Sequence, residues 1–152
     1  MKTIHVECNP DELLASKLGF SRKAIHHHQG KSRIFHSLKH CTETCLAIVD
    51  EDPGSVKTSY ESQLVKIEIY KGLILMKDQR GNKIIVLKGK LEDWLINACE
   101  QQDINIDKFG LPVKSNSLHE IINSRLQNLN KLLDYLIEEN HPEVLKLKQW
   151  LT

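Results

Sequence analysis

Apolar and polar residues at the start of the chain follow first a strand pattern and then a helix pattern. Residues 3–8 alternate polar and β-branched side chains, which predicts a strand. The segment Asn9-Pro10-Asp11-Glu12 ends it, and the apolar spacing of residues 13–18 predicts a short helix. Asn9 is the expected N-cap, and the first-turn carboxylates of Asp11 and Glu12 are expected to cap the helix and favour its dipole.

A second helix and a second strand are predicted next. Residues 21–29 contain three successive histidines and fit either a helix or a loop. An apolar stripe at helical spacing follows Gly30-Lys31-Ser32 and predicts a helix over residues 32–41. The continuous apolar run Leu46–Val49 is typical of a strand buried on both faces, and residues 50–54 end it abruptly.

The rest of the chain contains more strands and then helices. Strands are predicted over residues 64–70, 73–76 and 84–87, and we expect them to pair as hairpins at one side of the sheet. Helices are predicted over residues 91–100, 118–139 and 142–150. The apolar stripe of the 118–139 helix either covers the sheet or forms a surface for a partner protein or a homodimer.

This order of elements predicts an α/β fold with a mostly parallel central sheet flanked by helices. We expect residues 1–110 to form the α/β domain. Residues 111–152 are expected to form a C-terminal helical extension packed on or beside it.

Composition restricts the function only weakly. The formal net charge of the 152 residues is +1, so nucleic-acid binding would need a local patch or a bound metal. The apolar runs are too short to cross a membrane, and the N-terminus has the pattern of a strand rather than a signal peptide. We therefore expect a cytoplasmic protein whose four cysteines are reduced thiols.

Acidic residues follow two of the predicted parallel strands. Glu7 ends the first strand, and Asp50 and Asp52 follow Leu46–Val49. Residues i and i+2 of an extended segment point the same way, so Asp50 and Asp52 are expected to converge. Carboxylates at the carboxyl edge of a parallel sheet suit Mg²⁺ or Mn²⁺, although Asp-X-Asp alone is also common in solvated turns.

Histidines and cysteines offer a second candidate chemistry. His36 and His40 share a helix face and could bind zinc with Cys41 and Cys45. Cys41 fits the apolar helix face better, and Cys45 fits a small buried residue. His28, in the histidine run, either lies in a surface loop or lines the acidic crevice.

Two motifs resemble Toprim domains. Residues 6–12, Val-Glu-Cys-Asn-Pro-Asp-Glu, resemble the opening strand and turn of that family, and residues 48–54 resemble its Asp-X-Asp strand end. Gly30-Lys31-Ser32 is similar to the glycine-containing turn between these motifs. Residues 91–95 are similar to an acidic helix start in Toprim proteins of the overcoming-lysogenization-defect nuclease type.

The resemblance implies a Mg²⁺-dependent nuclease or phosphodiester hydrolase that acts on DNA or RNA, with a separately encoded ATPase as partner. It implies Glu7 as general acid/base or metal ligand, Asp50 and Asp52 as metal ligands, and Glu92 as a further ligand. The remaining expectations concern phosphate and substrate. Lys88 and Lys90 either neutralise phosphate oxygens or lie in a solvated turn, and Gly30, Lys31 and His28 are expected to contact substrate.

One departure from the family pattern favours an alternative function. Cys8 stands where a glycine usually follows the glutamate. A side chain there crowds the approach of a phosphate backbone, which favours a non-catalytic Toprim-like subunit that binds or regulates a partner protein.

Overall fold

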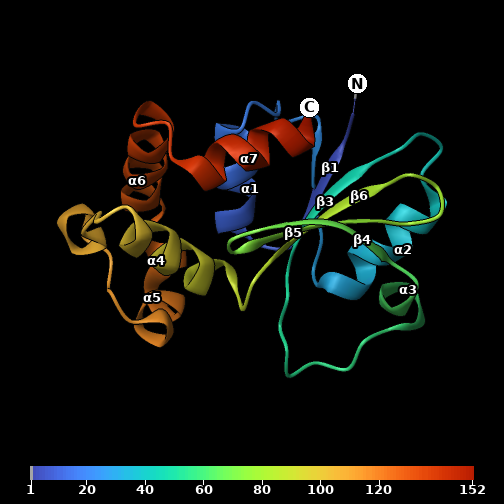
Figure 1. The fold of residues 1–152 in the computed structure, drawn as a ribbon, viewed down its shortest axis with the longest axis horizontal. Helices are drawn as coiled ribbons and strands as arrows, with labels where there is room; N and C mark the ends of the chain where they lie inside the picture. The colour runs from blue at the N-terminus through green and yellow to red at the C-terminus, as the bar shows by residue number, and fades with distance from the viewer. Residues whose placement is uncertain (1) are drawn as a thin grey trace.

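A six-stranded mixed sheet lies at the centre of the computed structural model, which describes residues 2–152 (Figure 1). The strands are β1 (Ile4–Val6), β2 (Ile25–His27), β3 (Leu46–Asp50), β4 (Val65–Tyr70), β5 (Leu73–Lys77) and β6 (Lys83–Leu87). Their order is β2-β1-β3-β6-β5-β4. The first four strands are parallel to one another, and β5 is antiparallel to both of its neighbours, β6 and β4. The α/β class, the mostly parallel sheet and the hairpins at one side are confirmed.

Helices cover both faces of this sheet (Figure 1). They are α1 (Asn9–Lys17), α2 (Lys31–His40), α3 (Ser59–Ser62), α4 (Leu91–Gln101), α5 (Ser115–Ile121), α6 (Leu126–Glu138) and α7 (Pro142–Leu151), with 3₁₀ turns at Ile106–Phe109 and Ile122–Ser124. Alternate strand residues point to opposite faces and enter two cores. Strand residues on the same face as Ile48 pack against α1, α4, α6 and α7. Strand residues on the same face as Val49 pack against α2 and α3.

The histidine run, expected as helix or loop, contains the edge strand β2. This strand pairs with β1 in parallel, with His5 opposite His26. The amide of Ile4 donates to Ala24 O at 2.9 Å, and the amide of His28 donates to Val6 O at 2.8 Å. Only three residues pair, and their side chains are half-buried or exposed, so the segment lacks the apolar pattern that marks a strand in sequence.

The single helix predicted over residues 118–139 is wrong. Helix α5 ends at Ile121, a 3₁₀ turn spans Ile122–Ser124, and α6 begins at Leu126. The hydroxyl of Ser124 donates to Ile121 O at 2.7 Å. A serine hydroxyl that donates to a backbone carbonyl in this way competes with the hydrogen bonds of a continuous helix. The apolar stripe therefore passes through a bend.

The C-terminal helices share a core with the sheet. One cluster of buried residues contains Ile4 and Leu46 of the sheet together with Leu132 of α6 and Leu147 of α7. The chain ends lie near each other (Figure 1), and Lys2 Nζ donates to Thr152 O at 3.1 Å. No helix within residues 2–152 combines the length and apolar character needed to cross a membrane.

Candidate metal centre

Four carboxyl side chains gather where β1 and β3 end and where α1 and α4 begin. Glu7 directly follows β1, Asp50 is the last residue of β3, Asp11 lies in the first turn of α1, and Glu92 is the second residue of α4. Because β1 and β3 are parallel neighbours, their carboxyl ends share one edge of the sheet. We call Glu7, Asp11, Asp50 and Glu92 the acid edge.

Asp50 is held in a strongly acidic environment. Burial first, and then the charges of Glu92 and Glu7, raise the pKa of its carboxyl to about 7. The backbone N–H of Leu91 donates to Asp50 Oδ1 at 3.0 Å and acts in the opposite direction, as does the charge of Lys31. Asp50 therefore changes protonation near neutral pH.

Asp11 is the most deeply buried member of the acid edge. Its side chain is 1% exposed, and its Oδ1 has no hydrogen-bond partner. Burial, followed by the charge of Asp50, raises the pKa of Asp11 to about 8. A buried carboxyl oxygen without a hydrogen-bond partner is costly in either protonation state, so Asp11 is poorly explained as a structural residue alone.

Helix capping does not account for Asp11. Cys8 is the N-cap, with no side-chain capping bond, and the buried face of α1 consists of Pro10, Asp11, Leu14 and Ala15. Asp11 thus occupies an apolar stripe at helical spacing, a signal that was present in the sequence. Glu12 lies outside that face, where its Oε2 meets His27 Nδ1 at 3.0 Å.

The acid edge offers the type of ligand that a hard divalent cation prefers. Four carboxyl groups offer oxygen ligands, and the unpartnered Asp11 Oδ1 is a buried acceptor that a cation would satisfy. Within residues 2–152, no three of these carboxyl groups have oxygens that all lie within 4.8 Å of one another. Such spacing is expected without a cation, because like charges repel. Mg²⁺ and Mn²⁺ keep several water ligands, so such a site needs only some of the four groups in direct contact.

The second aspartate of Asp-X-Asp is placed differently from the first. Strand β3 ends at Asp50, and Asp52 has a φ of 46°, so the extended geometry that would align the two side chains does not continue. The amide of Asp52 donates to Gly89 O at 2.9 Å, and Glu51 Oε1 accepts from the amide of Gly89 at 3.0 Å. A metal-binding role for Asp52 stays a prediction.

The predicted phosphate-binding lysines lie in the loop between β6 and α4. Lys88 and Lys90 are both exposed. Lys88 lines a cavity of about 390 Å³ with Lys71 and Trp94. The lysine whose charge lowers the pKa of Asp50 is Lys31 rather than Lys88 or Lys90. Catalytic roles for Lys88 and Lys90 stay predictions.

The turn before α2 leads into Lys31, whose charge lowers the pKa of Asp50. Gly30 has a φ of 119°, in the region that favours glycine, and is the N-cap of α2 without a side-chain capping bond. Lys31 Nζ donates to Glu51 O at 3.2 Å and pairs with Glu61 Oε2 at 3.2 Å. His28 is held by His5, whose Nδ1 lies 2.8 Å from His28 Nε2.

Two further groups touch the acid edge. Glu92 Oε1 lies 3.0 Å from Nδ1 of His119, which comes from α5. Burial, and next the charge of Asp11, raise the pKa of the Cys8 thiol, so Cys8 stays a neutral thiol. His119 was missed by sequence reasoning because it lies in a polar helix face with no motif around it.

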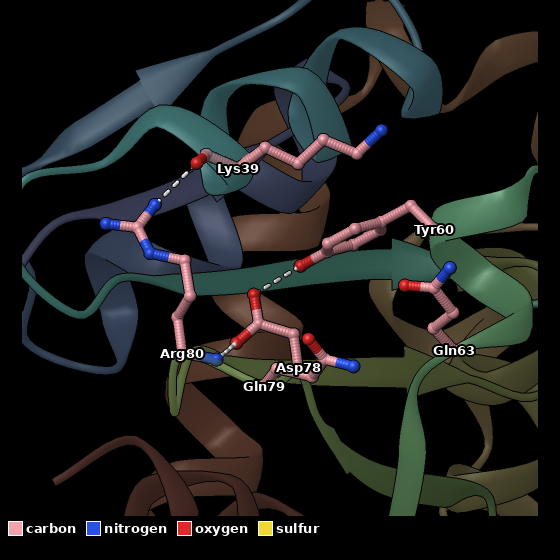
Figure 2. Close-up of a pocket in the computed structure, with 6 residues that line it drawn as sticks. All are labelled: Lys39, Tyr60, Gln63, Asp78, Gln79 and Arg80. Atoms are coloured by element: carbon pink, nitrogen blue, oxygen red, sulfur yellow. Dashed lines mark hydrogen bonds between the residues drawn. The ribbon is translucent and has the colours of Figure 1, made fainter.

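A separate cavity of about 260 Å³ lies between α2, α3 and the β5–β6 turn (Figure 2). Tyr60 Oη donates to Asp78 Oδ2 at 2.7 Å, and the amide of Arg80 donates to Asp78 Oδ1 at 2.9 Å. Arg80 Nη1 donates to Lys39 O at 2.6 Å. These bonds join three elements and give Tyr60, Asp78 and Arg80 a structural role.

The cysteines differ from the sequence-based expectation of four reduced thiols. Cys41 and Cys45 are joined as a disulfide, while Cys8 and Cys99 are free. The ring centroids of His36 and His40 lie 4.6 Å apart on the exposed side of α2, with the ring planes tilted by 59°. Comparison with known proteins finds no matching family model, no matching curated protein and no matching solved structure.

Proposed function

We propose that the acid edge binds Mg²⁺ or Mn²⁺ and that the protein is a Toprim-like, metal-dependent hydrolase of phosphodiester bonds in nucleic acid. The observation that carries this proposal is the unpartnered oxygen of Asp11, buried beside Asp50, Glu7 and Glu92. Burial and neighbouring negative charges raise the pKa of Asp50 and of Asp11, and such perturbed acidic groups are typical of metal centres and catalytic sites. The resemblance of residues 6–12 and 48–54 to Toprim motifs points to the same chemistry.

Each residue then has a distinct role. Asp50, Asp11 and Glu92 are the proposed ligands, and a bound divalent cation would polarise a phosphoryl oxygen and lower the pKa of a bound water. Glu7, half-buried at the end of β1, is the proposed general acid or base. Leu91, through its backbone N–H, fixes the orientation of Asp50.

The start of α2 supports phosphate binding. Its ten residues begin at Lys31, and the first backbone N–H groups of a helix favour an anion. The Nζ of Lys31 is engaged by Glu61, so the backbone rather than the lysine charge would provide most of the contact. The formal net charge of +1 makes a local site of this kind necessary.

Cleavage assays test the proposal. Wild type should cleave single-stranded or double-stranded DNA or RNA with Mg²⁺ or Mn²⁺ and not with EDTA. Asp50→Asn and Asp11→Asn should lower the rate by more than about 100-fold, since each removes charge at the reacting centre. Asp103→Asn, at an exposed turn after α4, is the matched control and should cleave like wild type.

Metal binding and cleavage should be measured on the same protein. If Mn²⁺ binds wild type and not Asp50→Asn, and no substrate is cleaved, the result would support the alternative of a non-catalytic subunit. Cleavage that is unchanged by EDTA or by both substitutions would refute the metal-dependent mechanism. An ATPase partner and a homodimer remain proposals, to be tested by co-purification and by light scattering.

A further inference from the structure

A second group of potential metal ligands lies away from the acid edge, on the face of the sheet that α2 covers. Within residues 2–152, His5, Cys41 and Cys45 form the group whose ligand atoms all lie within 4.8 Å of one another. Cys41 follows the end of α2, and Cys45 directly precedes β3. Pairing of β1 with β3 brings Cys45 beside the strand that carries His5. We call these three residues the Cys–His cluster.

His5 is oriented as a metal ligand would be. Its Nδ1 lies 2.8 Å from His28 Nε2, and its Nε2 lies 3.9 Å from Cys41 Sγ. If Nδ1 carries the proton and donates it to His28, the lone pair of Nε2 points toward the sulfurs. Metal-bound histidines usually have their second ring nitrogen held by such a hydrogen bond. His5 is also buried, 5% exposed, which favours the neutral ring.

The sulfurs have mixed polar neighbours. Ser37 O lies 3.2 Å from Cys41 Sγ and Glu43 O lies 3.3 Å from Cys45 Sγ, and these carbonyls accept from thiols. One further neighbour suits a thiolate. The hydroxyl of Thr3 donates to Cys45 Sγ at 3.4 Å. The Cys–His cluster opens on a cavity of about 210 Å³, lined also by Thr3, His26 and Glu43. Three protein ligands on one side and an open cavity on the other leave room for a water as fourth ligand of a tetrahedral ion.

We propose that the dithiol form of Cys41 and Cys45 binds one Zn²⁺ together with Nε2 of His5, and that the disulfide is the metal-free alternative of the same site. A thiol reductant supplies two electrons and two protons to break the S–S bond and is itself oxidised to a disulfide. The two thiols then release two protons as both sulfurs bind the ion. Two thiolates and one imidazole favour zinc over Mg²⁺, so this site and the acid edge select different metals.

Cobalt titration of the full chain tests the proposal, because Co²⁺ replaces Zn²⁺ and is coloured. Reduced wild type, kept anaerobic, should bind one equivalent with a thiolate-to-cobalt charge-transfer band and the intense visible bands of a tetrahedral ion. Zn²⁺ should displace the colour. Wild type oxidised to the disulfide should give no charge-transfer band, and this comparison needs no substitution.

Variants identify the ligands. Cys41→Ser, Cys45→Ser and His5→Asn should each weaken Co²⁺ binding by more than about 100-fold, and His28→Gln by about 10-fold. Cys99→Ser and His36→Asn are matched controls outside the cluster and should bind like wild type. Circular dichroism checks that each variant is folded.

Two results would overturn the proposal. One is reduced, folded wild type that shows no thiolate band at one equivalent of Co²⁺. The other is a band that persists in Cys41→Ser and Cys45→Ser. Asp50→Asn should keep the band, because cobalt at the acid edge would have only oxygen ligands, so failure of the proposed function would leave this test unaffected.

Discussion

Asp50 Oδ1 accepts a hydrogen bond from the backbone N–H of Leu91 at 3.0 Å, although 41 positions separate the two residues in sequence. This bond joins the end of β3 to the first residue of α4 and thereby brings Asp50 close to Glu92. The proximity has a measurable consequence, since Glu92 is the charge that contributes most to the raised pKa of Asp50. The acid edge is therefore a product of the β3–β6–α4 arrangement.

Stability should fall as pH rises in the absence of divalent metal. The pKa values of Asp50 and Asp11 are raised from 3.8 to about 7 and about 8, so the folded state holds protons that the unfolded state has released. The free energy of unfolding should therefore decrease from about pH 4 to about pH 8, by more than about 2 kcal/mol. Urea unfolding at a series of pH values measures this slope.

Substitution and metal identify the source of that slope. Asp11→Asn and Asp50→Asn should each flatten it, Mn²⁺ should flatten it in wild type, and Asp103→Asn should leave it unchanged. A free energy of unfolding that rises across this pH range in wild type would contradict the assignment of both groups.

Lys31 should tune the acidity of Asp50. Its positive charge lowers the pKa of Asp50, so Lys31→Met should move that pKa above its wild-type value of about 7. Carbon-detected NMR titration of the aspartate carboxyl groups reports the change directly. Lys39→Met removes an exposed lysine from the same helix as a control. An equal effect of both variants would show that net charge, rather than position, is responsible.

Gly72 should be intolerant of any side chain. An added Cβ would lie 2.8 Å from Trp94 Cδ1 and 3.1 Å from Glu143 Oε1. That oxygen accepts from the amide of Gly72 at 3.0 Å and from Trp94 Nε1 at 3.1 Å, so the contact joins the β4–β5 turn, α4 and α7.

Gly72→Ala should therefore destabilise the protein by about 1 to 3 kcal/mol, measured by chemical denaturation. At Gly54 an added Cβ meets nothing within 4 Å, so Gly54→Ala is the matched control and should have little effect. Equal stability of the two variants would mean that α7 does not pack as described.

Asn82 should be required for the turn before β6. It is 1% exposed; its Oδ1 accepts from the amide of Cys45 at 2.7 Å, and its Nδ2 donates to Leu38 O at 3.0 Å and Asp78 Oδ2 at 2.8 Å. Asn82→Ala leaves the buried amide of Cys45 without its acceptor. Leu38 O and Asp78 Oδ2 keep donors from Arg80 and Tyr60, so the substitution should cost about 1 to 3 kcal/mol of unfolding free energy. Gln79→Ala, at an exposed position of the same turn, should be nearly neutral.

The hydrophobic pattern determined most of the elements. Continuous apolar runs such as Leu46–Val49 predict buried parallel strands because both faces of such a strand are covered. Pro142 predicts the start of α7 because proline fits the first turn of a helix. At Ser124 the apolar pattern continues along the sequence but the helix is interrupted, because the serine hydroxyl donates to a backbone carbonyl.

Only the tertiary structure decided which polar groups meet. The sequence placed Glu7 and Asp50 at strand ends, but the order of strands and the packing of α1 brought Asp11 to them and buried it. In the same way, pairing of β1 with β3 brought His5 to Cys41 and Cys45. Local spacing is fixed along the chain, whereas the distance between residues on different elements depends on how sheet and helices pack.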